Sequence, residues 1–176
     1  MRNIFTLLIA SIVVMSFTSS DLKPVDANEA VTFAIKNFGI NTNGEFKGLK
    51  GIIKWDASNP SASVFNVTVD ANTINTDIDM RDSHLKKEEY FDASKYPTIN
   101  FVSTSITGDQ NGYTLSGHLT IKGITKDISF PFTVTHQNDG TVFTGTFSIN
   151  RKDFNVGGGS AVMGSNVDVS LKVLAR

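Results

Sequence analysis

The composition of this 176-residue chain argues against several classes of function before any motif is considered. With a formal net charge of −1 it offers no basic surface for nucleic acid, and the absence of cysteine excludes disulfides and thiol chemistry. The aromatic residues are 13 Phe, 3 Tyr and 1 Trp, so nearly all of the aromatic surface lacks a polar group. Such a composition suits an apolar interior better than a sugar-binding face.

Residues 1–20 are predicted to form a secretory signal peptide. Arg2 supplies the positive charge, residues 4–17 form an apolar run too short to span a bilayer comfortably, and residues 18–20 are small, as a signal peptidase requires. An N-terminal membrane anchor is the alternative. We expect one mature domain over residues 21–176, periplasmic or secreted, and without a cysteine for lipid attachment. Because disulfides are absent, its core alone must supply the stability.

The first half of the mature chain alternates apolar and polar residues as half-buried strands do. We predict strands over residues 31–36, 46–55 and 65–71, with a turn at Asn43-Gly44. A short polar helix follows, at about residues 79–90, with Asp77 or Asp79 as its N-cap. The helix must end before Pro97, since proline lacks an N–H and favours extended geometry in the residue before it.

The second half repeats the strand pattern more regularly. It predicts strands over residues 99–107, 114–121, 127–134, 143–149 and 167–173, hairpin turns at Asn111-Gly112, Lys122-Gly123 and Asp139-Gly140, and a loop over residues 151–166. Eight antiparallel strands with one apolar face form either a sandwich or a barrel. The sequential hairpins favour an all-β, eight-stranded antiparallel barrel with one short helix between its strands.

Two glycines on the apolar face bear on whether such a barrel is hollow. Gly117 and Gly145 lie between large apolar residues, where a packed core would need volume. They indicate either an internal cavity or bends at barrel corners. Any cavity would be so apolar that its occupant should be hydrophobic.

Six segments of the chain carry a resemblance to a known family. They read V-T-F-A-I-K-N-F-G at 31–39, G-E-F-K-G-L-K-G at 44–51, T-D-I-D-M-R-D-S-H-L at 76–85, Y-F-D-A-S-K-Y-P-T-I-N-F-V-S at 90–103, G-H-L-T-I-K-G-I-T at 117–125 and R-K-D-F-N-V-G at 151–157. In order and spacing they resemble the YceI-like family of exported lipid-binding proteins over essentially all of residues 25–175. The chain departs from the family pattern at Tyr90, where a phenylalanine is frequent, and at Asn155, where a glycine is common. The resemblance implies a lipocalin-like barrel that binds a long isoprenoid or similar amphiphile and has no established catalytic activity.

The residues themselves agree with this class of ligand, because each buried CH₂ of an isoprenoid tail contributes about 0.8 kcal/mol. We predict that the lumen is lined by Phe33, Ile35, Phe65, Val67, Phe101, Leu119, Phe130, Phe132, Phe143 and Phe147. A polar head group, such as a quinone ring or a phosphate, would remain at the mouth beside Arg81, Asp82 and His84. Alternatively, Arg81 and Asp82 pair with each other or with loop carbonyls, and His84 only packs the helix.

Other chemistry finds little support. His84, His118 and His136 fall on different predicted elements without metal-ligand spacing, and no nucleophile or nucleotide motif is present. We expect no metal, no cofactor and no enzymatic activity. The predicted partners are an amphiphilic isoprenoid lipid or quinone and, transiently, a membrane; monomer and homodimer stay open. Two alternatives also stay open: an enzyme or enzyme accessory that uses Asp82 and His84 as an acid–base pair, and a filled-core barrel that acts through protein contacts.

Overall fold

The computed structural model describes residues 21–159 and 162–176, so the predicted signal peptide lies outside the described residues. Within that part of the chain there are ten strands: β1 (Asp21–Leu22), β2 (Val31–Asn37), β3 (Ile40–Phe46), β4 (Lys50–Lys54), β5 (Val64–Asp70), β6 (Thr98–Asp109), β7 (Gly112–Ile121), β8 (Ile124–Gln137), β9 (Gly140–Asn150) and β10 (Met163–Ala175). One α-helix, α1 (Asp79–Leu85), and three 3₁₀ turns, η1 (Pro60–Ala62), η2 (Ala71–Thr73) and η3 (Arg151–Phe154), complete the description.

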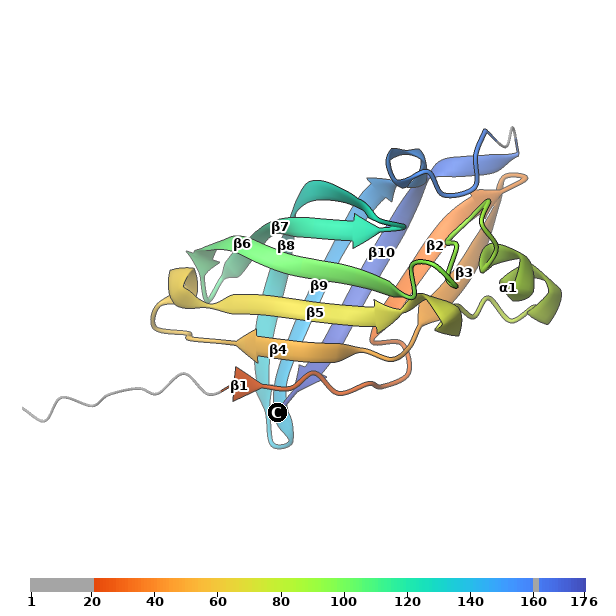
Figure 1. The fold of residues 1–176 in the computed structure, drawn as a ribbon. Coiled ribbons are helices and arrows are strands. Elements are labelled where there is room, and N and C mark those ends of the chain that lie inside the picture. The colour runs from red at the N-terminus through yellow and green to blue at the C-terminus, as the bar shows by residue number, and fades with distance from the viewer. Residues whose placement is uncertain (1–20, 160–161) are drawn as a thin grey trace, which may run out of the picture.

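All strands belong to one antiparallel sheet in the order β1-β4-β5-β6-β7-β8-β9-β10-β2-β3. The sheet curls into a half-barrel, so that β4 to β7 face β8 to β10 across the interior (Figure 1). Its edges are joined to the rest of the chain by short bridges, from Pro24 to Ala175 and from Glu45 to Asn75. The expectation of an all-β antiparallel fold with one short helix is therefore confirmed.

The predicted count of eight strands is wrong, because β1 and β3 were missed. The sequence of β3, Ile40–Phe46, is mostly polar and lacks the apolar alternation that reveals a half-buried strand. Asn43-Gly44, predicted as a turn, lies inside β3. The turn that joins β2 to β3 is Phe38-Gly39, whose φ angles of 50° and 79° are those of a tight two-residue hairpin. A phenylalanine is rare in such a turn, which is why the sequence did not reveal it.

The other predicted turns and the helix are present with shifted boundaries. Lys122-Gly123 turns as expected, with φ angles of 51° and 74°. The two remaining hairpins turn one residue earlier than predicted, since Asp109 pairs with Gly112 and Gln137 pairs with Gly140. Helix α1 ends at Leu85 rather than near residue 90, and its N-cap is Ile78, which supplies no side-chain hydrogen bond. The predicted cap by Asp77 or Asp79 is therefore wrong.

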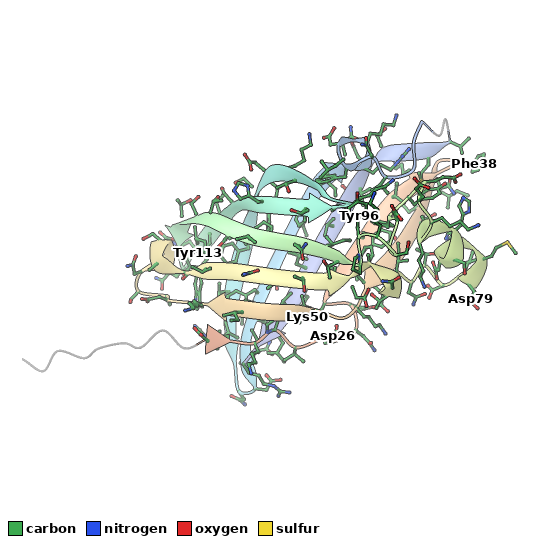
Figure 2. All side chains as sticks on the ribbon, viewed as in Figure 1. Asp26, Phe38, Lys50, Asp79, Tyr96 and Tyr113 are labelled. Atoms are coloured by element: carbon green, nitrogen blue, oxygen red, sulfur yellow. The ribbon has the colours of Figure 1, made fainter. Side chains whose placement is uncertain are left out.

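One end of the half-barrel is filled by aromatic rings, and we call it the closed end. The Trp55 ring contacts those of Tyr113, Phe132 and Phe143 edge-on at centroid distances of 5.0, 5.9 and 5.7 Å. Tyr113 lies at the opposite end of the molecule from Phe38 and Asp79 (Figure 2). Aromatic rings thus fill the interior at the end opposite α1. Among the described residues, no helix combines the length and apolarity needed to cross a membrane.

Candidate functional site

The curled sheet encloses an apolar cavity of about 240 Å³. A single water requires only roughly 10–15 Å³ on the same scale, so the cavity is many times larger than the space of one water molecule. Inward-facing residues of β2 to β10 form its walls. They include all ten of the residues predicted to line the lumen: Phe33, Ile35, Phe65, Val67, Phe101, Leu119, Phe130, Phe132, Phe143 and Phe147.

These ten residues divide by depth. Five are buried, namely Phe65, Leu119, Phe130, Phe132 and Phe143. The others are only partly buried although they share the inner face, namely Phe33, Ile35, Val67, Phe101 and Phe147. Some polar residues of the lining, Thr32, Thr68, Asn100 and Thr144, lie along the strands. Others lie at the end near α1, which we call the mouth and define by Asn37, Thr42, Thr76, Arg81, Arg151 and Met163. The cavity therefore has a mostly apolar interior, and its charged lining residues lie at the mouth.

Part of the lining comes from segments that the sequence did not assign to it. Phe46 on β3, Leu85 at the end of α1, and Phe91 in the connection between α1 and β6 also face the cavity. The Phe46 ring lies 5.4 Å from the Phe33 ring and 5.4 Å from the Phe91 ring. Leu85 and Phe91 are apolar residues in an otherwise charged stretch, and that contrast could have identified them as the side that packs inward.

Gly117 and Gly145 do not leave the space that their positions indicated. A Cβ at Gly117 would lie 2.5 Å from Cζ of Phe101, and one at Gly145 would lie 3.2 Å from Cε2 of Phe130. Each glycine is thus covered by the ring of a phenylalanine on a neighbouring strand, an arrangement that lets large rings lie flat on the sheet. The cavity exists, but the missing side chains of these glycines are not its cause.

Asp82 and Arg81 are organised around Thr76 at the mouth. The buried Asp82 carboxylate accepts hydrogen bonds from the Thr76 N–H at 3.0 Å and from the Thr76 hydroxyl. Arg81 donates through Nε to Thr76 Oγ1 at 2.7 Å and through Nη2 to the Thr76 carbonyl. Asp82 therefore fixes the chain where it enters α1, while Arg81 faces the cavity.

His84 lies apart from these two residues. Its side chain is half exposed, its Nε2 is 3.7 Å from Oε2 of Glu89, and its ring is 5.0 Å from that of Tyr90. It is not among the residues that line the cavity. Of the three residues expected beside a head group, the structure thus brings only Arg81 to the cavity wall, and it does not pair Asp82 with His84.

Arg151 is the functional candidate that sequence reasoning missed. It is only 3% exposed and lines the cavity, yet its guanidinium donates to four carbonyls, those of Val156, Gly158, Met163 and Gly164, at 2.7–3.2 Å. Loss of hydration in the interior lowers the pKa of Arg151 from its usual value. Through these bonds the residue ties the segment from Val156 to Gly158 to the start of β10.

The structure also explains one departure from the family pattern. Asn155 adopts a left-handed φ of 53°, which glycine tolerates best and asparagine tolerates better than most residues. Lys122 Nζ donates to the Asn155 carbonyl at 2.9 Å and to the Glu88 carbonyl at 2.6 Å. The β7–β8 turn, the β9–β10 loop and the connection after α1 are thereby tied together around the mouth.

The described residues contain no cluster of three or more His, Asp or Glu side chains that could hold a metal ion. His118 pairs with Asp127 across β7 and β8, with Nδ1 2.6 Å from Oδ1, and both are well exposed. His136 contacts Thr141 at 3.1 Å. The three histidines therefore occupy separate places, as their spacing predicted.

Comparison with known proteins places the chain in a family. A model described as the YceI-like domain matches residues 22–175. A UPF0312 protein of Pectobacterium atrosepticum is 33% identical over 133 residues, 72% of this chain and 69% of that protein. Protein YceI of Salmonella arizonae is 32% identical over 133 residues, 72% of this chain and 70% of that protein. The chain belongs to the YceI-like family.

Solved structures agree with this assignment. Burkholderia cenocepacia BcnA superposes with a TM-score of 0.77 at 28% identity, over 83% of this chain and 94% of that chain. A polyisoprenoid binding domain from Saccharophagus degradans, implicated in plant cell wall breakdown, superposes with a TM-score of 0.73 at 15% identity, over 88% of this chain and 97% of that chain. The second likeness shows the fold alone.

Proposed function

We propose that this protein binds a long-chain isoprenoid lipid or quinone-like amphiphile in its cavity and acts as a carrier or scavenger, not as an enzyme. The observation that carries the proposal is the cavity itself, whose walls are almost entirely apolar and whose charged lining residues, Arg81 and Arg151, lie at the mouth. A hydrocarbon chain needs burial and few hydrogen bonds, and each CH₂ moved out of water contributes about 0.8 kcal/mol. The naming of a structural neighbour as a polyisoprenoid binding domain supports the same ligand class.

The head group would lie at the mouth beside Arg81. A guanidinium has five N–H donors, and Thr76 accepts from only two of the Arg81 nitrogen atoms. The remaining donors suit a quinone carbonyl or a phosphate oxygen. Asp82 would contribute indirectly, by holding Thr76 and so the position of Arg81.

The alternative functions receive less support from the geometry. An acid–base role for Asp82 and His84 would require both to reach one reacting group, but Asp82 is buried against Thr76 and His84 faces Glu89. A filled core would require the phenylalanine rings to close the interior, yet a cavity remains between them. Export to the periplasm or the medium is proposed from the signal peptide alone.

Native mass spectrometry of the purified protein, followed by organic extraction, tests the proposal. A bound isoprenoid or quinone, returned chemically unchanged, is the expected result. Val67→Trp should fill the partly buried half of the cavity and weaken lipid binding at least about tenfold, because several CH₂ groups lose their place. Asn66→Trp, on the same strand but exposed, is the matched control and should bind normally. Equal binding by both variants, or no binding by the unmodified protein, would refute a lipid-binding cavity.

The head-group position is tested separately. Arg81→Ala should weaken binding of a lipid with its head group several-fold and leave binding of the bare hydrocarbon chain unchanged. His84→Ala, from the same helix, is the control and should have no effect. Unchanged affinity in a folded Arg81→Ala protein would exclude Arg81 from head-group recognition.

A further inference from the structure

Five exposed apolar side chains gather at the mouth end, and we call them the apolar rim: Phe38, Ile40, Ile78, Met80 and Val162. Their exposed fractions are 74%, 72%, 51%, 83% and 43%. Among the large hydrophobic residues that the structure describes, the four most exposed all belong to this rim. Single exposed apolar residues are ordinary, but a group at one end of a molecule marks an interaction surface.

The rim adjoins the cavity mouth directly. Phe38 and Val162 follow and precede the mouth residues Asn37 and Met163, and the Phe38 N–H donates to the Val162 carbonyl at 2.9 Å. Met80 precedes Arg81, which also belongs to the mouth. The β2–β3 turn, α1 and the β9–β10 loop project from the same end of the half-barrel (Figures 1 and 2). A partner that binds the apolar rim therefore also covers the mouth of the cavity.

Phe38 gains nothing from its position within the folded monomer. It adopts a left-handed φ of 50°, which costs energy for a bulky residue, and its side chain is mostly in water. Beside it in the turn, Gly39 has no heavy atom of the described residues within 4 Å of the place where its Cβ would be. A strained, exposed phenylalanine is accounted for by a contact outside the monomer.

The charges around the rim favour one kind of partner. Ile78 and Met80 alternate in sequence with Asp77, Asp79 and Arg81, so both signs of charge lie beside the apolar residues. Lys86 and Lys87 follow α1 but are balanced by Glu88 and Glu89, so the described helix and its flanks lack a polybasic patch of the type that binds anionic lipid. Mixed charge beside protruding apolar groups complements a zwitterionic phospholipid surface, whose headgroups also carry both signs.

We propose that the apolar rim docks onto the surface of a zwitterionic phospholipid bilayer, with Phe38 and Met80 inserted among the acyl chains and the cavity mouth facing the membrane. Rim and mouth are continuous, so a lipid could pass between bilayer and cavity without carrying its chain through water, which would cost about 0.8 kcal/mol per CH₂. The rim residues come from three separate segments and present isolated protrusions, which a fluid surface accommodates without a complementary shape. This inference rests on the proposed function only for the transfer of a lipid through the mouth; the docking is argued from the rim itself.

Sedimentation with phosphatidylcholine vesicles at millimolar lipid tests the docking surface. The protein should sediment with the vesicles, and the double variant Phe38→Asn/Met80→Gln should partition at least about tenfold more weakly, because two apolar insertions are lost. Asparagine suits the left-handed turn and glutamine suits a helix, so this variant should fold. The matched control is Ile52→Thr/Val64→Thr, which changes two exposed residues on β4 and β5, 45% and 41% exposed, away from the mouth. It should sediment like the unmodified protein.

Fluorescence gives the orientation. The single tryptophan, Trp55, lies at the closed end and is 8% exposed, so brominated phosphatidylcholine should not quench it. Phe38→Trp places a second tryptophan on the rim, and its emission should shift to the blue and be quenched by the same vesicles.

Several results would overturn the proposal. These are no partitioning of the unmodified protein, equal weakening by the rim and control variants, quenching of Trp55, or a dimer that Phe38→Asn abolishes, which would assign the rim to a second copy.

A second measurement, the binding of lipid that is delivered from ethanol without vesicles, separates the docking proposal from the proposed lipid-binding function. Rim variants should retain this binding, whereas Val67→Trp should lose it and still sediment with vesicles.

Discussion

The closed end and the mouth are built from the same strands with the same alternation of apolar and polar residues, yet they differ in how tightly their aromatic rings are packed. At the closed end, Trp55, Phe65, Phe132 and Phe143 are 4–8% exposed, and their rings pack edge-on against one another. At the mouth, Phe33, Phe101 and Phe147 share the inner face but stay partly exposed to the cavity. The contrast indicates that one end supplies the stability of the fold and the other remains open for binding.

The two ends are also fastened differently. Main-chain hydrogen bonds seal the closed end, where the Lys23 N–H donates to the Arg176 carbonyl at 2.8 Å and the Arg176 N–H donates to Lys23 at 3.1 Å. Polar side chains hold the mouth: Arg151 binds loop carbonyls, Asp82 binds Thr76, and Lys122 joins two loops. Among the described residues, the two buried charged side chains, Asp82 and Arg151, both lie at the mouth.

The largest difference should appear when one phenylalanine from each end is truncated. Phe143→Ala, at the closed end, should lower the free energy of unfolding by about 3–5 kcal/mol, because it leaves a void among packed rings. Phe147→Ala, four residues along β9 towards the mouth, should lower it by only about 1–2 kcal/mol, since that ring is only partly buried in the folded protein. Urea unfolding followed by circular dichroism measures both. Equal losses would mean that the mouth half is as well packed as the closed end.

A smaller difference should separate the two arginines at the mouth. Arg151→Met should lower the free energy of unfolding by about 2–3 kcal/mol, because four carbonyls lose their shared donor inside the protein. Arg81→Met should cost less than about 1 kcal/mol, since Arg81 is only partly buried and bonds to one residue. Urea midpoints of the two variants measure the difference. A loss at Arg81 as large as that at Arg151 would show that Arg81 is structural.

The free energy of unfolding should depend on pH through Glu45 on β3. The N–H of Glu29 donates to the Glu45 carboxylate at 3.1 Å, and this hydrogen bond lowers the pKa of Glu45 below its ordinary value of 4.5. Because the folded pKa is the lower one, the stabilisation is complete above the unfolded pKa and is lost as the pH falls through the folded pKa.

Glu45→Gln should therefore reduce the loss of stability below pH 4.5 by a few tenths of a kcal/mol, a small effect because solvent screens this carboxylate. Thermal unfolding of both proteins across this pH range is the measurement. An identical pH dependence in the variant would remove Glu45 as its source.

The smallest expected change is a gain in stability at the rim. Phe38→Asn should raise the free energy of unfolding by about 0.5 kcal/mol, because asparagine tolerates the left-handed turn and no internal contact is lost. A differential scanning calorimeter would detect the higher melting temperature. A clear destabilisation would show that Phe38 packs within the monomer and would weaken its assignment to an external surface.

The sequence by itself determined which face each strand buries. Alternation has a period of two and is a local property, so the ten lumen residues could be placed on the inner wall without knowing the fold. Local chemistry also located the turn at Lys122-Gly123 and the end of the helical stretch before Pro97. It failed at β3 and at Phe38-Gly39, where polar strand residues and a bulky turn residue contradict local preference.

Only the tertiary structure decided how deep each of those residues lies and what surrounds the opening. The depth of each lumen residue depends on how the strands stagger and on which distant segments cover their ends. Neither property can be predicted from a short stretch of neighbouring residues. For the same reason Arg151 could not be recognised as buried, since its acceptors lie in the loop that it folds. The rim forms only because curling of the sheet brings the β2–β3 turn, α1 and the β9–β10 loop to one end.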